Sequence, residues 1–237
     1  MGFRSSRPAA AKGAPKRRLL RKVLRVLLLV LAGFYGSVAL SLIALRWVDP
    51  PVTSVQIQRR VESWFRRGRY QKRYSFVPLA RISPGFQHAV VAAEDSRFFT
   101  HHGFDWEEIK DAVDEQAEDG RLRGASTIDQ QLVKNLFLTN WRSPVRKAVE
   151  VTLVPLAEVI LGKRRILELY LNVVEWGPGV YGAEAAARYH YGVPAAGIGR
   201  EQGARLAAIL PSPRRRRPAR MDGYSSVILE RMQIMGW

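Results

Sequence analysis

Two adjacent acids, Glu94 and Asp95, are the residues whose type and setting first suggest chemistry. They follow the apolar run HAVVAA at 88–93 and precede phenylalanines and histidines within 98–102. Partial desolvation by such neighbours makes a carboxylate more basic, and a basic carboxylate can take the proton of a hydroxyl group. A structural interpretation is also available, because a glutamate after a helix is commonly solvated and the histidines could bond backbone groups. This stretch alone leaves both interpretations open.

A second polar cluster occupies residues 124–138, GASTIDQQLVKNLFL. Ile128, Leu132 and Leu136 recur at helical spacing and share one face. The other faces carry hydrogen-bonding side chains, namely Thr127, Gln130, Gln131, Lys134 and Asn135. A helix that opens at Ser126-Thr127 would point its free N–H groups outward, which suits an oxyanion.

Basic residues close by could complete a phosphate site. Lys134 together with Arg142, Arg146 and Lys147 would supply the positive charge. Each of them alone is explained as a solvated charge, and Arg146 with Glu150 forms an i,i+4 pair that contributes about 0.3–0.5 kcal/mol to a helix. The chain has 4 histidines and no His-Glu-x-x-His pattern, so we expect no dedicated zinc site.

Four motifs occur in order within the chain: ED-x-x-F-x-x-H-x-G at 94–103, G-x-S-T-I-x-Q-Q-x-x-K-N-L-F-L at 124–138, R-K-x-x-E at 146–150 and K-x-x-I-L-E-x-Y-L-N at 163–172. Together they resemble the peptidoglycan glycosyltransferases, glycosyltransferase family 51, over residues 85–212. The resemblance implies a mainly α, lysozyme-like glycosyltransferase domain. One departure is Asp129, because the family pattern usually has threonine there. No Ser-x-x-K or Lys-Thr-Gly occurs, so the transpeptidase domain of bifunctional relatives is not expected and the likeness is to monofunctional transglycosylases.

The resemblance implies that lipid II is polymerised into glycan strands. A growing glycan on polyprenyl pyrophosphate is the donor, and a sugar 4-hydroxyl of lipid II attacks its anomeric carbon with inversion. Glu94 matches the general base, and Glu150 matches a second catalytic glutamate that orients cations on the donor side. The expected substrate-binding residues are Asp95, Ser126, Thr127, Gln130, Gln131, Lys134, Asn135, Arg142, Arg146 and Lys147. No organic cofactor is expected, and Mg²⁺ or Mn²⁺ stays open because the sequence shows no protein ligand set.

Helices are expected to position nearly all of these residues. Apolar spacing or strong helix formers predict helices at 86–94, 105–118, 126–138, 144–161, 163–175, 182–191 and 201–210, after an earlier one at 55–65. Ser143-Pro144 marks one helix start and Gly162 its end, and Pro155 is expected to kink its last turns. We find no convincing pair of alternating strands, and the turn-rich stretch 177–182 predicts a chain reversal.

Charge and hydropathy indicate a membrane. The 38 Lys and Arg against 21 Asp and Glu imply an anionic partner, and 47% hydrophobic residues can fill a core. Residues 1–25 hold nine basic side chains and no acid, and the twenty uncharged residues of 26–45 span roughly 30 Å as a helix. This predicts a single-pass anchor with a cytoplasmic N-terminus. A cleaved signal peptide is the alternative, but its apolar region is usually shorter.

The predicted organisation is a basic cytoplasmic tail (1–25), a transmembrane helix (26–45), a membrane-proximal connector (46–84), a glycosyltransferase domain (85–212) and a C-terminal tail (213–237). We expect the inner membrane as the location, with the catalytic domain in the periplasm. The expected partners are the membrane, lipid II and the growing glycan, with cell-division or elongation proteins as further candidates and no nucleic acid. Two alternatives remain: a lytic enzyme acting on finished peptidoglycan, which leaves the cationic cluster unexplained, and a non-enzymatic membrane-anchored scaffold.

Overall fold

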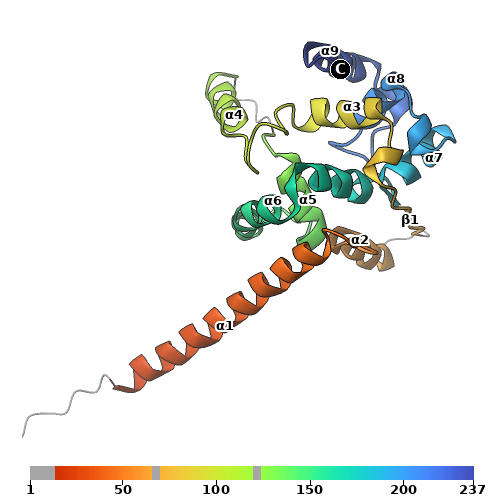
Figure 1. The fold of residues 1–237 in the computed structure, drawn as a ribbon. Coiled ribbons are helices and arrows are strands. Elements are labelled where there is room, and N and C mark those ends of the chain that lie inside the picture. Colours follow the sequence, from red (N-terminus) through yellow and green to blue (C-terminus); the bar gives the residue numbers. More distant parts are fainter. Residues whose placement is uncertain (1–13, 66–69, 120–123) are drawn as a thin grey trace, which may run out of the picture. The chain divides into compact units, whose positions relative to one another are not determined.

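The computed structural model describes residues 14–65, 70–119 and 124–237 and is mainly helical, as predicted (Figure 1). The chain divides into two compact units, 1–41 and 42–237. Helix α1 (Ala14–Ala44) lies largely in the first unit, and most of its large apolar side chains, such as Leu29 and Val30, are exposed. From Arg18 to Ala44 this helix is long and apolar enough to cross a membrane. The predicted N-terminal apolar helix is therefore present.

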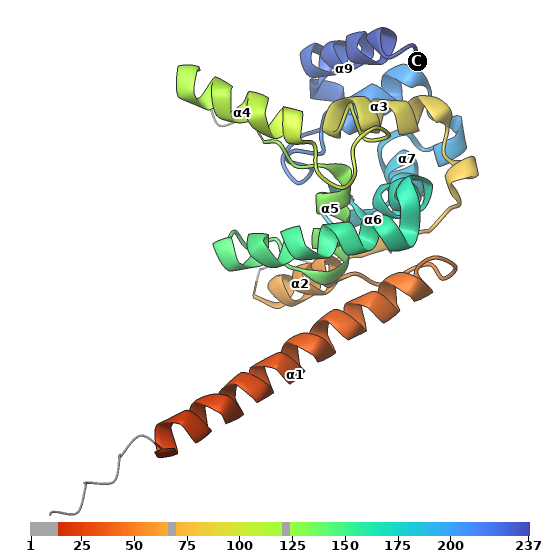
Figure 2. The same ribbon diagram turned by 60° about the vertical axis from the view of Figure 1, so that its left-hand side comes forward.

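The second unit contains the other helices. In chain order they are α2 (Ser54–Trp64), α3 (Pro84–Glu94), α4 (Trp106–Asp119), α5 (Ile128–Phe137), α6 (Pro144–Val173), α7 (Ala183–Tyr191), α8 (Arg200–Ala207) and α9 (Asp222–Ile234). Helices α3, α8 and α9 pack together, α5 packs on α6, and α4 extends outward (Figures 1 and 2). The helices predicted for this part of the chain are thus present, and α9 is an additional one that the sequence patterns did not predict.

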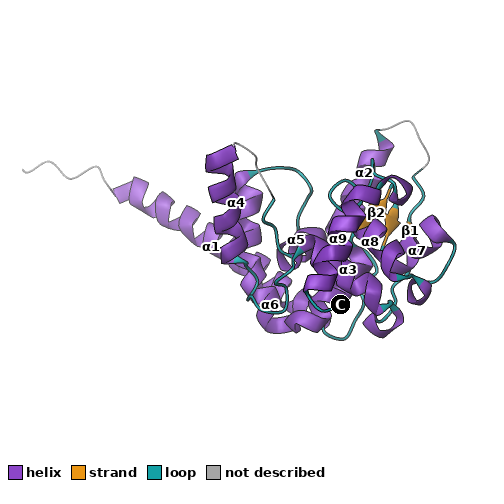
Figure 3. Ribbon diagram, turned by 90° about the horizontal axis from the view of Figure 1, so that it is seen from above, coloured by secondary structure: helices purple, strands orange, loops and turns teal. Residues whose placement is uncertain are grey.

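A small sheet joins distant parts of the second unit (Figure 3). Its strands are β1 (Arg73–Tyr74), β2 (Glu175–Gly177) and β3 (Val180–Tyr181), in the order β1-β3-β2. Strand β3 runs parallel to β1 and antiparallel to β2. The reversal expected at 177–182 is the turn between β2 and β3. Strands of 2 or 3 residues are too short to show an alternating pattern, which explains why none was predicted.

The connector before α3 contributes to the core of the second unit. Val77, Leu79 and Ile82 are buried in it, although the stretch 64–82 reads as a basic, apolar segment suited to a membrane. Trp64 and Phe65, at the end of α2, are exposed. Among the described residues of this stretch, Trp64 and Phe65 are the large hydrophobic side chains that are exposed.

Two helix ends determine where the candidate residues lie. The hydroxyl of Ser83 accepts a hydrogen bond from the backbone N–H of Phe86 at the start of α3, and α3 ends at Glu94. Helix α6 starts after Ser143, as predicted, although the Ser143 side chain makes no capping bond. At Gly162 the backbone turns to φ +71°, so α6 consists of two helical stretches that meet at this glycine. The expected helix end at Gly162 is thus confirmed.

Close contact between α3 and α8 depends on Gly203. A Cβ atom at this position would lie 2.9 Å from Cα of Phe86 and 3.1 Å from the carbonyl oxygen of Gly85. Phe86 is fully buried and meets the ring of Trp176 at 5.2 Å in an edge contact. Because both crowded atoms are backbone, α3 would have to shift to accommodate a methyl group.

We therefore expect Gly203→Ala to lower the free energy of unfolding by about 1–3 kcal/mol, the usual cost of overpacking. Chemical denaturation followed by tryptophan fluorescence measures it. Gly223→Ala in α9 is the matched control, because no atom lies within 4 Å of a Cβ built there. Equal stability of the two variants would show that α3 and α8 do not need the glycine.

Candidate active site

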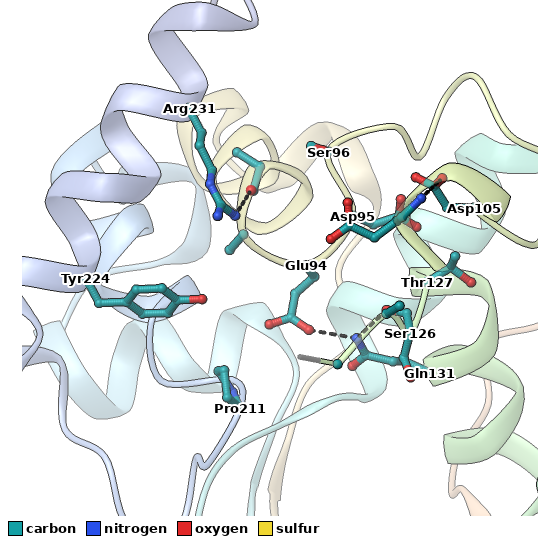
Figure 4. A pocket seen from close by; sticks show the side chains of 15 residues that line it. Glu94, Asp95, Ser96, Asp105, Ser126, Thr127, Gln131, Pro211, Tyr224 and Arg231 are labelled. Carbon is teal, nitrogen blue, oxygen red and sulfur yellow. Dashed lines mark hydrogen bonds between the residues drawn. The ribbon is translucent and has the colours of Figure 1, made fainter. Parts of the chain in front are cut away.

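A cavity of about 340 Å³ opens where α3 ends and α5 begins. Five residues predicted for the site line it, namely Glu94, Asp95, Ser126, Thr127 and Gln131. Tyr224 and Arg231 line it from α9, across from Gln131, and the Glu94 carboxylate lies between the two sides (Figure 4). The motif residues thus meet at one cleft, and the C-terminal helix supplies its other wall.

The two carboxylate oxygens of Glu94 differ in their contacts with the described residues. Oε2 accepts a hydrogen bond of 2.7 Å from Nε2 of Gln131, and no described residue bonds Oε1. Burial raises the pKa of Glu94, while the bond from Gln131 and the charge of Lys134 act in the opposite direction. The result is a carboxylate more basic than one in water, with a lone pair available to a hydroxyl in the cleft.

Gln131 is itself fixed by a tyrosine. The hydroxyl of Tyr170 donates a bond of 3.0 Å to Oε1 of Gln131, which leaves the amide nitrogen to face Glu94. Tyr170 is fully buried, and burial raises its pKa well above the ordinary value, so it stays a neutral donor. The chain Tyr170–Gln131–Glu94 therefore fixes the amide orientation and the direction of the carboxylate. Tyr170 lies in the fourth motif, but the pattern assigned it no role.

Asp95 lines the cavity, but its carboxylate is already engaged by protein groups at the start of α5 and by His101. Its Oδ2 accepts the backbone N–H of Ile128 at 2.9 Å, and its two oxygens lie 2.9 and 3.0 Å from Nε2 of His101. The Thr127 hydroxyl accepts the backbone N–H of Gln130. The expectation of free N–H groups for an oxyanion at this helix start is therefore wrong for these two groups, because protein oxygens already satisfy them.

Gln130 and Asn135 make structural contacts near the cleft. Oε1 of Gln130 accepts the backbone N–H of Thr127 and lies 3.3 Å from Nζ of Lys147. The amide of Asn135 donates to the backbone carbonyl of Gln131 at 2.7 Å. Both side chains are buried. Gln130 links the start of α5 to Lys147 on α6, Asn135 bonds the backbone within α5, and neither lines the cavity.

Glu150 is enclosed by cations. Its two carboxylate oxygens are bonded by a guanidinium nitrogen of Arg146 and by Nζ of Lys147, the latter at 2.6 Å. Glu150 is buried, so these two contacts compensate its charge. The expected i,i+4 pair of Arg146 and Glu150 thus exists as part of a triad with a surplus of positive charge. Arg142 is exposed in the segment between α5 and α6 and is not brought into this triad.

The charges of both Glu94 and Glu150 act on Lys134. Burial and the charges of Arg146 and Lys147 lower its pKa, whereas Glu150 and Glu94 raise it. Among the residues that the structure describes, its ammonium has neither a hydrogen bond nor an ion pair. A half-buried cation without an anionic partner is costly, and a bound phosphate would remove that cost.

A metal ion is poorly accommodated by the described residues. Ligand atoms of Asp95, His101 and Asp129 lie within 4.8 Å of one another. However, Nζ of Lys163 lies 3.1 Å from Asp129 and 3.4 Å from His101, so a positive charge already occupies this region. Burial and the nearby Glu158 carboxylate raise the pKa of Asp129 to about 8, which makes it a weak ligand at neutral pH. The cluster does not fit Mg²⁺ or Mn²⁺.

Comparison with known proteins identifies the family. The Transglycosylase family model matches residues 60–234, well over half of the chain. The chain belongs to the transglycosylase family. A biosynthetic peptidoglycan transglycosylase of Pseudomonas entomophila (strain L48) is 46% identical over 206 residues, covering 87% of this chain and 86% of that protein. Those of Ectopseudomonas mendocina (strain ymp) and Pseudomonas syringae pv. tomato (strain DC3000) are 45% and 41% identical. The predicted family and its mainly α, lysozyme-like fold are confirmed.

This transglycosylase has site residues that sequence reasoning missed. Tyr224 and Arg231 line the cavity from α9. The guanidinium of Arg216 lies over the ring of Tyr224, 5.6 Å from its centroid, and its charge is among those that lower the pKa of Glu94. The segment was assigned to a C-terminal tail. Its signal was the spacing of Ser225, Ile228 and Met232, which are buried on one face of α9.

Proposed function

We propose that this transglycosylase polymerises lipid II into glycan strands with release of polyprenyl pyrophosphate. The observation that supports this best is that Glu94, a desolvated carboxylate lining the cavity, lies close enough to Lys134 for each charge to act on the pKa of the other, while no described residue forms an ion pair with Lys134. The reaction needs both groups: a base for the attacking hydroxyl and a cation for the departing phosphate. A hydrolase acting on finished glycan releases no phosphate and needs no such cation.

In the proposed reaction Glu94 is the general base. The 4-hydroxyl oxygen of lipid II attacks the anomeric carbon of the donor, and Oε1 of Glu94 takes the hydroxyl proton. The bond from that carbon to the pyrophosphate oxygen breaks, and the bonding electrons leave with the phosphate. Gln131 keeps Oε2 occupied, which directs the other oxygen toward the cleft. Attack opposite the leaving group inverts the anomeric centre.

The pyrophosphate is proposed to bind at Lys134 and at the triad of Arg146, Lys147 and Glu150. Negative charge grows on the leaving oxygen as the bond breaks, and a cation already in place stabilises it without reorganisation. Glu150 keeps both of its cations in position and lowers their cost of burial. Arg142 would meet the outer part of the lipid phosphate, and Ser126 and Thr127 the sugar in the cleft.

A membrane location is proposed on two features of the chain. The apolar helix ending at Ala44 suits an anchor, and the nine basic residues of 1–25, before its uncharged part, favour a cytoplasmic N-terminus and a periplasmic catalytic unit. The exposed Trp64 and Phe65 of the second unit suit the interfacial region of a bilayer, where the lipid-linked substrate lies. Cell-division or elongation proteins remain proposed partners.

The test is a polymerisation assay with the purified full chain and labelled lipid II in detergent. Formation of glycan polymer supports the proposal. Cleavage of finished peptidoglycan without polymer would indicate a lytic enzyme, and neither activity would indicate a scaffold. Repeating the assay with a chelator tests the metal. Because the clustered ligand atoms do not fit a divalent ion, we expect polymerisation to continue.

Because burial raises the pKa of Glu94, we expect the rate to rise with pH through a value above that of an ordinary glutamate. Gln131→Met removes the bond that stabilises the charged carboxylate, so the rising limb of kcat/KM is expected at a still higher pH. Initial polymerisation rates across a pH series measure both. Gln202→Met in α8, whose side chain bonds only its own helix start, is the control. If the rising limb of kcat/KM for Gln131→Met lay at a lower pH than that of the unsubstituted protein, the hydrogen bond from Gln131 would not be what stabilises the charged Glu94.

A further inference from the structure

The ammonium of Lys163 lies in a buried network behind the cleft. Its Nζ is 3.1 Å from Oδ2 of Asp129, 3.1 Å from Oε2 of Glu158 and 3.4 Å from Nδ1 of His101. The ring of Phe98 lies 4.5 Å away on another side. The side chain of Asp129 is fully buried, and those of Lys163 and Glu158 are largely buried. The lysine is therefore held in place by contacts on several sides.

These contacts decide which nitrogen of His101 carries a proton. An ammonium has donors and no acceptor, so the Nδ1 atom that faces it must offer a lone pair. The opposite nitrogen, Nε2, lies 2.9 and 3.0 Å from the two oxygens of Asp95, and a carboxylate accepts. Both partners thus favour the tautomer with hydrogen on Nε2. In the other tautomer the hydrogen on Nδ1 would face the Lys163 ammonium, and the lone pair on Nε2 would face the Asp95 carboxylate.

We propose that Lys163 is a positioning residue that holds His101 in the Nε2–H tautomer and thereby keeps the Asp95 carboxylate on the start of α5. Asp95 also accepts the backbone N–H of Ile128, the first residue of that helix. One turn further along, Gln131 holds Glu94. Lys163 thus acts on the base through His101, Asp95 and α5, without touching the cleft.

Asp129 has a defined part in this network. The family pattern usually has threonine at this position, and a threonine has one side-chain oxygen where an aspartate has two, here 3.3 and 3.1 Å from Nζ of Lys163. Here an oxygen of Asp129 and an oxygen of Glu158 each lie 3.1 Å from Nζ of Lys163, so two acceptors face the ammonium. The departure from the family pattern therefore adds an acceptor oxygen beside the lysine rather than changing the cleft.

The test measures the ring nitrogens directly. The full chain is labelled with nitrogen-15 histidine, and the His101 signals are assigned by their loss in His101→Gln; only 4 histidines are present. In the unsubstituted protein we expect hydrogen on Nε2 and none on Nδ1. In Lys163→Met we expect Nδ1 to gain hydrogen in a measurable fraction of molecules. Lys163→Arg keeps a donor-only cation and is expected to retain the Nε2–H tautomer.

Polymerisation of lipid II is measured on the same samples. We expect Lys163→Met to lower kcat by about tenfold to a hundredfold through misplacement of the base, with a smaller change in KM, and Lys163→Arg to recover much of it. Arg59→Met is the matched control. It also removes a largely buried cation from ion pairs, with Glu62 and Glu175, but has no contact with His101.

The two readouts separate this proposal from the proposed function, on which only its catalytic part rests. Hydrogen on Nδ1 in the unsubstituted protein would overturn the proposal, whatever the activity. An unchanged tautomer in Lys163→Met would also overturn it, and this spectrum needs no substrate. If Lys163→Met fails to fold, the unsubstituted protein and Lys163→Arg still decide the tautomer. Absence of polymerisation in the unsubstituted protein would instead contradict the proposed function.

Discussion

Glu94→Gln is expected to reduce lipid II polymerisation by about 10²–10⁴-fold, the usual contribution of a general base. The substitution keeps the shape of the side chain, and the new amide oxygen can still accept the hydrogen bond from Gln131. What is lost is the ability to take a proton from the sugar hydroxyl. Because burial disfavours the charged form of Glu94, its replacement by a neutral amide should not destabilise the protein.

Single-turnover measurements with labelled lipid II give the rate of the chemical step, and thermal melting reports the fold. Glu230→Gln makes the same substitution on the exposed face of α9 and is expected to leave the rate unchanged. If Glu94→Gln polymerised lipid II at the normal rate with a normal melting temperature, Glu94 would not be the base, and another group would have to take the proton.

Lys134→Met is expected to lower kcat by about 10²–10³-fold, comparable to removal of one preorganised group that stabilises developing negative charge. The same variant is expected to be more stable than the unsubstituted protein. The pKa of Lys134 is lowered in the folded state, mainly by burial, so its charge opposes folding until an anion binds. Methionine has a similar length and carries no such cost.

The sign of the pH dependence follows from the lowered pKa. The destabilisation by Lys134 is fully present below its folded-state pKa and is lost as the pH rises toward the unfolded value of about 10.4. The stability gain of Lys134→Met should therefore be largest near neutral pH and shrink in alkaline buffer. Lys110→Met, an exposed lysine on α4, should show neither effect. A less stable but active Lys134→Met would mean that this lysine is structural.

The motif residues could be predicted from the sequence because their chemistry is local to short patterns. Glu94 and Gln131 lie in separate motifs and meet at 2.7 Å, as the shared site required. The helices that carry them show clear apolar spacing, and the proline and glycine signals at Pro144 and Gly162 placed the start and the end of the first helical stretch of α6. The prediction succeeded where a residue type has one usual structural role, such as proline at a helix start or glycine at a helix end.

Other parts of the site depend on contacts that no local pattern encodes. Asp95 was predicted to bind substrate, but its carboxylate lies between His101 and the N–H of Ile128, a residue 33 positions away. Helix α9 was missed because its exposed face carries apolar Val227 and Ile234 while its buried face includes Ser225, which gives little helical contrast. Its place against α3 and α8 comes from tertiary packing, and with it Tyr224 and Arg231 reach the cleft.

The backbone turn at Gly162 separates two tasks that α6 combines. The stretch before it carries Glu150 with its cations, and the stretch after it carries Tyr170, which holds Gln131 beside Glu94. With φ at +71° and no atom within 4 Å of the place a Cβ would take, this glycine is required by its backbone angle and not by crowding. The angle between the stretch that carries Glu150 and the stretch that carries Tyr170 is therefore set at a residue that takes part in neither group of contacts.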